Sequence, residues 1–457
     1  MSQKTIPTTT QLQDKLTEVA SELGVPGVAM GVLVDGEEQY AFHGVTSIEN
    51  PLPVDENTLF QFGSTGKTYT ATAMMRLVEQ GLVDLNEKVK TYIPEFTLQD
   101  KNTEENVTVL QLFNHTAGWS GDVLDDTGDG DDALEKYVAL LATVPQEFPL
   151  GKAASYNNAA LSVAGRIIEK VTGKTYEQAM KELIFEPLGL DNHFFFLNDI
   201  ATRRFVVGHT EGDNGELVVA RPLALPRGGS PAGGMSATAG DLIKWARFHL
   251  GDGTPLLSKE TLDLMKQPTS VMGDNADFIG ISWMLSDVDG VRVVEHGGNT
   301  VGQNCGFKMI PERNFAVVVL ANGGPNSGVL EEQLTKWAFE TYAGVVETMP
   351  EPVKRADDEL AEYLGTYETI AVVIDVTAGD GGLLAKANVR PEVWAKIAEG
   401  EPPDEPPYPL GFLESPGDRY IVSDGPAKGM KGYFPRGDDG VVDGIHLGGR
   451  LALKKGS

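Results

Sequence analysis

Cysteine is almost absent from this chain. Cys305 is the single cysteine among 457 residues, so no disulfide can form within the chain, and the usual sign of an oxidising compartment is missing. Its neighbours Asn304, Gly306 and Phe307 carry no positive charge that would stabilise a thiolate. We therefore expect Cys305 to be a small buried residue and not a nucleophile.

Long hydrophobic runs are missing as well. The longest of them, such as Phe315–Leu320, have the length of a strand, whereas a membrane-spanning helix needs roughly 20 apolar residues. Met1–Thr10 is polar and has neither the basic start nor the apolar stretch of a signal peptide. The sequence therefore predicts a cytoplasmic protein with no membrane partner.

Positive charge is scarce relative to negative charge. The chain has 37 Lys and Arg residues against 66 Asp and Glu residues, which gives a net charge of −29. Such a surface repels nucleic acid and anionic lipid, so we expect no nucleic-acid partner. A hydrophobic fraction of 41% with 23% charged residues is typical of a folded globular protein, and the length suggests two or three domains.

The order of the expected elements indicates an α+β fold. Apolar residues at helical spacing predict an opening helix over 11–23, and β-branched runs around Gly36 predict a hairpin of strands at 28–34 and 39–45. Residues 69–80 are expected to form a helix that is apolar nearly all round and therefore buried. Further helices are expected at 132–143, 158–172, 175–185, 239–250, 259–266 and 330–343, and further strands at 281–286, 291–295, 306–310 and 314–320. Strands at both ends with helices between them predict an antiparallel sheet.

A break in this pattern divides the chain. Residues 346–357 contain Met349–Pro352, which ends any helix, so we expect a linker between a first domain, 1–345, and a last domain, 358–457. The last domain consists of short strands with Gly, Pro and Asp turns, which predicts a small all-β barrel or sandwich. The Pro-rich piece 401–409 is expected to be a surface loop within it.

Ser64 and Lys67 stand three residues apart at the start of the buried helix, so both lie on one helical face. A hydroxyl alone is a weak nucleophile, but a neighbouring amine can accept its proton, and a helix N-terminus favours developing negative charge. Burial against Met74 and Met75 would lower the pKa of Lys67 and make its amine a base. The alternative is a serine N-cap with a solvated lysine one turn further on.

Tyr156 and Asn158 lie at the mouth of a further helix. A tyrosine near an ammonium group loses its proton more easily, so Tyr156 could carry a proton between the serine and a leaving group. The amide of Asn158 could orient both the lysine and a substrate carbonyl. The alternative is an asparagine N-cap beside a packing tyrosine.

His296, Gly298 and Asn299 follow the strand expected at 291–295. Glycine beside a strand permits the close approach of another backbone, here that of a substrate laid along the strand. The backbone amides of Ser64 and Asn299 would then hold an oxyanion. By itself, a histidine before glycines is more often a turn residue.

In this order the three motifs resemble those of the penicillin-binding protein and class C β-lactamase-like serine hydrolases. That family carries Ser-x-x-Lys, Tyr-x-Asn and then Lys-Thr-Gly or His-x-Gly, and the matching positions are Ser64 and Lys67, Tyr156 and Asn158, and His296 and Gly298. The resemblance implies no cofactor, catalysis by Ser64, Lys67 and Tyr156, and substrate binding by Asn158, His296, Gly298 and Asn299. Whether Lys67 or Tyr156 is the acylation base stays open.

Other segments support the resemblance, which covers roughly residues 10–345. Residues 110–118 look like the family's Leu-Leu-x-His-Thr-Ser-Gly segment, in which we expect His115 to hold a loop under the site, and 231–236 look like its Pro-Ala-Gly-Gly-hydrophobic-Ser stretch. The resemblance implies a β-lactamase/DD-peptidase-like antiparallel sheet with helices on both sides. The tail, with Gly444–Arg450, looks like the lipocalin-like β-barrel appended to some family peptidases.

The implied activity is hydrolysis, through an acyl-enzyme on Ser64, of small peptides or amides that contain D-amino acids, as in D-aminopeptidases and DD-peptidases. A carboxylesterase and a β-lactamase are alternatives within the family. A catalytically inactive binding or assembly module is an alternative of another class. The expected partner is a small-molecule or short-peptide substrate, and assembly into a homo-oligomer stays open.

Two features bear on the substrate. The histidine at position 296 is only partly charged near neutral pH, whereas a lysine there would give a permanent charge for a substrate carboxylate. The acidic stretch Asp122–Asp132 fails the calcium-loop pattern, because Thr127 stands at its third position and Lys136 where the bidentate glutamate belongs, so we expect no metal site. If that stretch rims the pocket, both features favour amides or esters with a free or neutral end.

Overall fold

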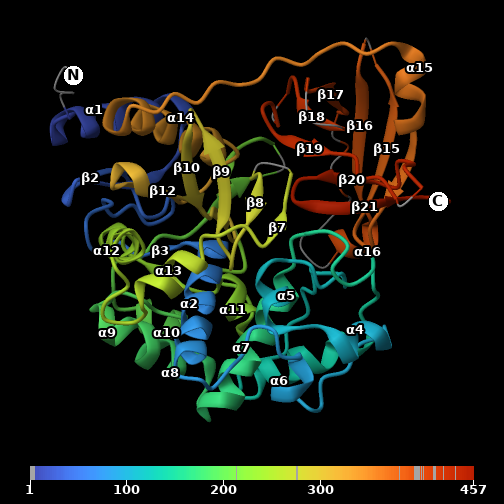
Figure 1. Ribbon diagram of the computed structural model, residues 1–457. Coiled ribbons are helices and arrows are strands. Elements are labelled where there is room, and N and C mark those ends of the chain that lie inside the picture. The colour runs from blue at the N-terminus through green and yellow to red at the C-terminus, as the bar shows by residue number, and fades with distance from the viewer. Residues whose placement is uncertain are drawn as a thin grey trace.

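The computed structural model describes residues 6–212, 214–273, 276–379, 381–395, 402, 404, 406–414, 418–425, 427–437 and 439–456. A nine-stranded antiparallel sheet lies in its upper left part and centre (Figure 1), with the order β2-β1-β13-β12-β10-β9-β8-β7 and β11 paired with β12. The strands are β1 Gly27–Val34, β2 Glu37–Gly44, β7 Ser270–Val271, β8 Phe278–Ile279, β9 Met284–Val288, β10 Val291–Glu295, β11 Gly298–Asn299, β12 Asn304–Ile310 and β13 Phe315–Ala321. Because β1 pairs with β13, the early hairpin and the late strands form one sheet.

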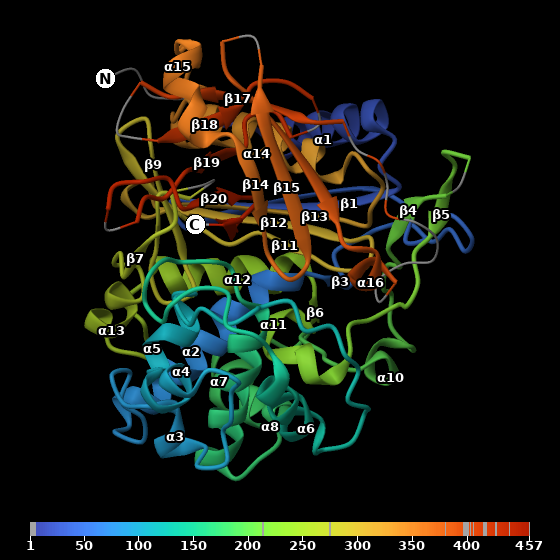
Figure 2. The same ribbon diagram turned by 90° about the vertical axis from the view of Figure 1, so that its right-hand side faces the viewer.

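Helices cover both faces of this sheet (Figure 2), which confirms the expected fold class. Helices α1 Thr9–Leu23 and α14 Ser327–Ala338 pack on one face, where Val28, Met30 and Val32 of β1 point. The intervening residues of β1, such as Ala29 and Leu33, enter the other core, which contains α2 Gly66–Glu79 and α12 Ala239–Leu250. The period of two along a strand therefore divides one apolar run between two cores.

The remaining helices lie mostly below the sheet in Figure 1, and two short strand pairs accompany them, of which β4 and β5 lie beside the sheet in Figure 2. They are α3 Val89–Tyr92, α4 Lys101–Asn106, α5 Val109–Phe113, α6 Ala133–Leu140, α7 Asn158–Thr172, α8 Tyr176–Met180, α9 Glu186–Leu188, α10 Leu197–Ile200, α11 Ser230–Gly233 and α13 Lys259–Leu264, with strand pairs β3 Phe60–Gln61 and β6 Ser236–Ala237, and β4 His209–Glu211 and β5 Leu217–Val219. The expected helix at 158–172 is found at those residues, because Asn157 caps its start and Gly173 ends it.

The last part of the chain forms a closed barrel of eight antiparallel strands. They are β14 Gly365–Glu368, β15 Val372–Ala378, β16 Leu383–Val389, β17 Tyr408–Phe412, β18 Arg419–Val422, β19 Lys431–Tyr433, β20 Gly444–Leu447 and β21 Arg450–Lys454, accompanied by α15 Asp357–Leu360 and α16 Pro391–Trp394. Aromatic side chains such as Tyr367, Phe412 and Phe434 fill its interior. The barrel prediction is confirmed, whereas the boundaries drawn at 345 and 358 stay a prediction.

The Pro-rich piece 401–409 differs from its expected form at one end. Tyr408 and Pro409 belong to strand β17, in which Tyr408 pairs with Ala385 and Pro409 with Leu384. Residues 401, 403 and 405 lie outside the described residues. The loop prediction is therefore wrong for its last two residues, because proline is tolerated where a strand begins.

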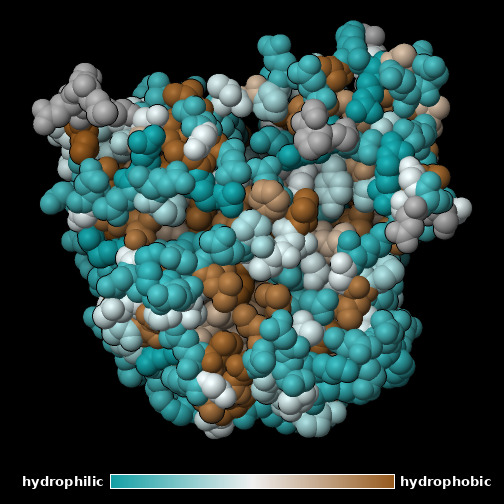
Figure 3. All heavy atoms as spheres, in the orientation of Figure 1, coloured by the Kyte–Doolittle hydropathy of each residue, from teal (hydrophilic) through white to brown (hydrophobic). Residues whose placement is uncertain are grey.

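The face drawn in Figure 3 is mostly hydrophilic, with hydrophobic patches in the middle of its lower half. This agrees with the excess of acidic residues in the sequence. Within the described part of the chain, every helix falls short of the length and apolar character needed to cross a membrane.

Candidate active site

Ser64 lies on a tight turn, Gly63–Thr65, that leads directly into α2, and its side chain is partly exposed. Gly63 adopts φ +52°, and a Cβ atom there would lie only 2.7 Å from the carbonyl oxygen and 2.8 Å from the nitrogen of Asn299. Only glycine fits this conformation and this contact. The turn therefore presents Ser64 at a helix N-terminus beside strand β11.

Lys67 is completely buried, so the alternative of a solvated lysine is wrong. Its Nζ lies 2.9 Å from Ser64 Oγ and donates a hydrogen bond of 2.7 Å to the carbonyl oxygen of Ala232, in α11. Burial lowers the pKa of Lys67 well below its usual value, Arg450 lowers it further, and Asp122 acts in the opposite direction. The amine next to the hydroxyl is thus held towards its neutral, proton-accepting form.

The ring of Tyr156 faces the amine of Lys67. The Nζ atom of Lys67 is 4.8 Å from the centre of the Tyr156 ring. Burial raises the pKa of Tyr156, and this outweighs the opposing effects of its hydrogen bond with Ser64 and of the charge of Arg450. The phenol therefore stays protonated in the free protein.

His115 lies beneath this tyrosine. It is fully buried, its ring centre is 4.6 Å from that of Tyr156, and its Nδ1 accepts a hydrogen bond of 3.3 Å from the backbone N–H of Asn157. Burial lowers the pKa of His115 well below its usual value, so the ring is neutral. Its position agrees with the expectation that it supports the loop under the site.

The third motif contacts the first through the backbone. The hydroxyl of Thr65 donates a hydrogen bond of 2.8 Å to the carbonyl oxygen of His296. A Cβ atom at Gly298 would lie 2.0 Å from the carbonyl oxygen of Phe62 and 2.9 Å from the nitrogen of Ser64. Asn299 is exposed. The backbones that carry the two expected oxyanion-binding amides, those of Ser64 and Asn299, are therefore packed against each other.

The charge expected for His296 is wrong. This side chain is only 1% exposed, and burial, with a smaller effect from Lys67, lowers its pKa to about 3. Its Nδ1 forms a hydrogen bond of 2.7 Å with the carbonyl oxygen of Gly297. His296 is therefore a neutral group at neutral pH and not a partial cation.

The contact expected between Asn158 and Lys67 is also absent from the described hydrogen bonds. Asn158 instead donates from Nδ2 to Oδ1 of Asp122 over 2.9 Å. Lys67 is held by Ser64 and by the Ala232 carbonyl, as described above. The sequence motif correctly placed Asn158 at the start of a helix, but it could not show that the side-chain amide bonds to Asp122 and not to Lys67.

The barrel supplies a site residue that the sequence reasoning missed. Arg450, at the start of β21, places its guanidinium carbon 4.7 Å from the centre of the Tyr156 ring and donates two hydrogen bonds of 3.0 Å to Asp122. The preceding residue, Gly449, accepts a hydrogen bond of 2.8 Å from the backbone N–H of Tyr156. In the sequence, the segment Gly444–Arg450 resembles part of the barrel of some family peptidases, but this resemblance does not by itself indicate that Arg450 reaches the site.

Arg450 corrects the expected electrostatics of the site. A guanidinium stays protonated at any ordinary pH, so a permanent positive charge stands beside Tyr156 although position 296 has no lysine. The carboxylate of Asp122 is paired with this guanidinium. The negative charge of Asp122 is therefore compensated, and the expectation that the acidic stretch disfavours anionic substrates stays a prediction.

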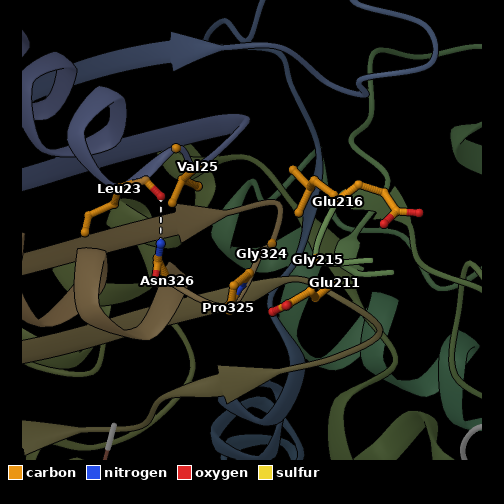
Figure 4. A pocket seen from close by; sticks show the side chains of 11 residues that line it. Leu23, Val25, Glu211, Gly215, Glu216, Gly324, Pro325 and Asn326 are labelled. Atoms are coloured by element: carbon orange, nitrogen blue, oxygen red, sulfur yellow. Dashed lines mark hydrogen bonds between the residues drawn. The ribbon is translucent and has the colours of Figure 1, made fainter. Parts of the chain in front are cut away.

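A pocket of about 170 Å³ lies elsewhere, between the end of α1, the β4–β5 hairpin and the turn before α14 (Figure 4). Figure 4 shows carboxylates of Glu211 and Glu216 near its rim, and Asn326 bonded to the carbonyl oxygen of Leu23. None of its described lining residues belongs to the three motifs. The candidate active site is accordingly the cluster around Ser64.

Comparison with known proteins identifies the class. The beta-lactamase family model matches residues 12–339, so the chain belongs to this family and is a serine hydrolase by class. Penicillin-binding protein 4 of Amycolatopsis lactamdurans is 33% identical over 371 residues, which cover 78% of this chain and 96% of that protein.

Two solved structures extend the likeness to the barrel. A crystal structure of SurE with D-Leu has a TM-score of 0.76 and 25% identity, covering 98% of this chain and 99% of SurE. The octameric penicillin-binding protein homologue from Pyrococcus abyssi has a TM-score of 0.65 and 23% identity, covering 98% of this chain and all of that one, 100%. The combination of sheet, helices and barrel is thus a recurring architecture.

Proposed function

We propose that this protein is a hydrolase that forms an acyl-enzyme on Ser64 and cleaves small peptides or amides containing D-amino acids. The observation that carries the proposal is the buried amine of Lys67, 2.9 Å from the Ser64 hydroxyl, with a pKa well below its usual value. A neutral amine in that position can accept the hydroxyl proton while the oxygen attacks a carbonyl carbon. The partly exposed Ser64 is open to such a carbonyl.

The opposite pKa shifts of Lys67 and Tyr156 support a division of roles. Lys67 is the better acylation base, because Tyr156 would have to lose its proton against a raised pKa. Tyr156, still protonated, is suited to donate its proton to the departing amine. The protonated Lys67, whose Nζ lies 4.8 Å from the centre of the Tyr156 ring, then passes the proton taken from Ser64 to the resulting phenolate. The amides of Ser64 and Asn299 are the proposed donors to the oxyanion. Water then attacks the acyl-enzyme and regenerates the serine.

The proposed substrate class has three supports. SurE, which was crystallised with D-Leu, resembles this chain over nearly its whole length, including the barrel. Arg450 offers a fixed positive charge beside Tyr156, which suits the carboxylate of an amino acid or short peptide. Gly298, on the strand edge next to Ser64, leaves room for a substrate backbone.

Acylation by β-lactams is a second candidate. The objection drawn from a histidine at position 296 weakens, because Arg450 can hold the carboxylate that a penicillin carries. Relatives from Yersinia enterocolitica and Escherichia coli are named beta-lactamases and are 27% and 26% identical to this chain.

A substrate panel tests both candidates. Purified protein would first be treated with a fluorophosphonate or a fluorescent penicillin, and intact mass and peptide mapping would locate the adduct on Ser64. Turnover would then be compared for D- and L-leucyl and D- and L-alanyl p-nitroanilides, a D-alanyl dipeptide, a short acyl ester and a penicillin. We expect a D over L preference of at least tenfold, the size of a modest pocket discrimination. Equal rates for the enantiomers, or a penicillin hydrolysed faster than every amide, would reject the D-peptide assignment.

Assembly into a homo-oligomer stays a prediction. The homologue from Pyrococcus abyssi is octameric, and its likeness to this chain is one of fold. Light scattering on the purified protein would give the mass in solution, and a monomer would reject the prediction.

A further inference from the structure

Asp122 is held differently from the rest of the acidic stretch to which it belongs. Asp125, Asp129 and Asp131 are exposed, whereas the side chain of Asp122 is only 32% exposed. Its Oδ1 accepts hydrogen bonds from Asn158 Nδ2 at 2.9 Å and from Arg450 Nη2 at 3.0 Å, and its Oδ2 accepts one from Arg450 Nε at 3.0 Å. One carboxylate therefore joins the second motif to the barrel.

These contacts restrict both donors. A carboxylate only accepts hydrogen bonds, so the nitrogen of the Asn158 amide must face Asp122 and its oxygen must point away. The Nε and Nη2 edge of Arg450 is likewise directed at Asp122, which leaves Nη1 for another partner. The same guanidinium lies over Tyr156 at 4.7 Å. Asp122 thus decides which atoms of two site residues remain available.

Asp122 also acts on the amine of Lys67. Its negative charge raises the pKa of Lys67, whereas Arg450 lowers it and burial lowers it most. The two charges of the ion pair therefore have opposite effects on the same base. The other titratable groups that face Lys67 are Tyr156, His115 and His296.

We propose that Asp122 is a positioning residue that orients Asn158 and Arg450 and balances the charge beside Lys67. The proposal rests on the proposed function, because it requires Lys67 to be the base that activates Ser64.

The test is the pH dependence of Ser64 labelling by a fluorophosphonate, which needs no knowledge of the substrate. The labelling rate should rise with pH as Lys67 loses its proton, because only the neutral amine accepts the hydroxyl proton. Asp122→Asn removes the negative charge, so the midpoint of this rise should move to lower pH by roughly half a unit. Arg450→Gln should move it in the opposite direction by a similar amount. Asp122→Glu keeps the charge and should keep the midpoint near that of the wild type, with a slower rate.

A matched control separates positioning from docking of the barrel. Lys152 and Asp443 form a second ion pair between the barrel and the rest of the chain, and Lys152→Gln breaks it. This variant should keep the wild-type midpoint, and melting curves would show that each variant is folded.

An Asp122→Asn midpoint equal to those of the wild type and of Lys152→Gln would overturn the proposal while leaving the proposed function intact. If Asp122→Asn does not fold, an Asp122→Glu midpoint that moves with Arg450→Gln would overturn it. Absence of wild-type labelling at Ser64 would overturn the proposed function itself, and this proposal with it.

Discussion

Two basic side chains lie beside Tyr156, and they come from regions of very different kind. Lys67 belongs to the start of α2, three residues from Ser64, and is completely buried. Arg450 is the first residue of the barrel strand β21, far along the chain from Lys67, and remains partly exposed. Both lie within 5 Å of the same ring, at 4.8 Å and 4.7 Å.

The two groups differ in charge because their surroundings differ. The amine of Lys67 has no carboxylate within hydrogen-bonding distance among the described residues, so burial drives it towards the neutral form. Arg450 keeps its charge, because a guanidinium holds its proton and because Asp122 pairs with it through two hydrogen bonds. The three-residue spacing in the sequence thus places the base Lys67 next to Ser64, whereas the barrel, distant in sequence, contributes the permanent positive charge of Arg450.

The largest effect is expected from the local region. Ser64→Ala should abolish labelling and reduce turnover by about 10³-fold or more, and Lys67→Met should be nearly as damaging because the two residues act as one unit. Neither the turn nor α2 uses the Ser64 side chain as a cap, so the variant should stay folded. Rates and melting curves of the single and double variants would be measured together. Additive losses would mean that the two residues do not cooperate.

Changing Arg450 of the barrel should affect the choice between substrates more than the rate of the chemical step. Arg450→Gln should reduce kcat/KM about 10- to 100-fold for a peptide with a free carboxylate and much less for its amidated form, since a charged hydrogen bond contributes about 1.5–3 kcal/mol. Arg419→Gln is the matched control, because Arg419 is also a barrel arginine but pairs with Asp277 and not with Asp122. Equal losses for both substrate forms would assign Arg450 to docking of the barrel instead of substrate selection.

A pair of glycines can separate backbone strain from the contact that shapes the site. Gly63 and Gly81 both have positive φ, +52° and +70°, but a Cβ atom at Gly81 meets nothing within 4 Å, whereas one at Gly63 meets Asn299. Gly81→Ala should cost about 1 kcal/mol of unfolding free energy and keep labelling. Gly63→Ala should cost more and slow labelling. Similar labelling in both variants would show that the contact between the turn and β11 does not matter.

The smallest effect is expected at the boundary between the two regions. Residues 346–354 are exposed, so limited proteolysis should cut between 346 and 357, as the predicted linker requires. The fragments should stay associated, since the barrel holds Tyr156 and Lys152 through several contacts. Cleavage followed by gel filtration would check this. Preferential cutting inside the barrel would reject the boundary.

Much of the fold could be predicted from periodicity. The hairpin at 28–34 and 39–45 corresponds to β1 and β2, and the late strands correspond to β9, β10, β12 and β13. These predictions succeeded because strand and helix periods are local properties of the chain. The last domain was predicted as a barrel or sandwich, but no residue of it was assigned to the site, since no local pattern encodes where a domain docks.

The sequence by itself determined the three motifs, their order and the placement of Ser64 and Lys67 on one helical face, because residues three apart on a helix are neighbours wherever the helix packs. Only the tertiary structure decided the charge at position 296 and the presence of a guanidinium beside Tyr156. Burial makes His296 neutral, and the docked barrel brings Arg450 to Asp122. Desolvation and ion pairing depend on groups distant in sequence, so no spacing within the motifs could have revealed them.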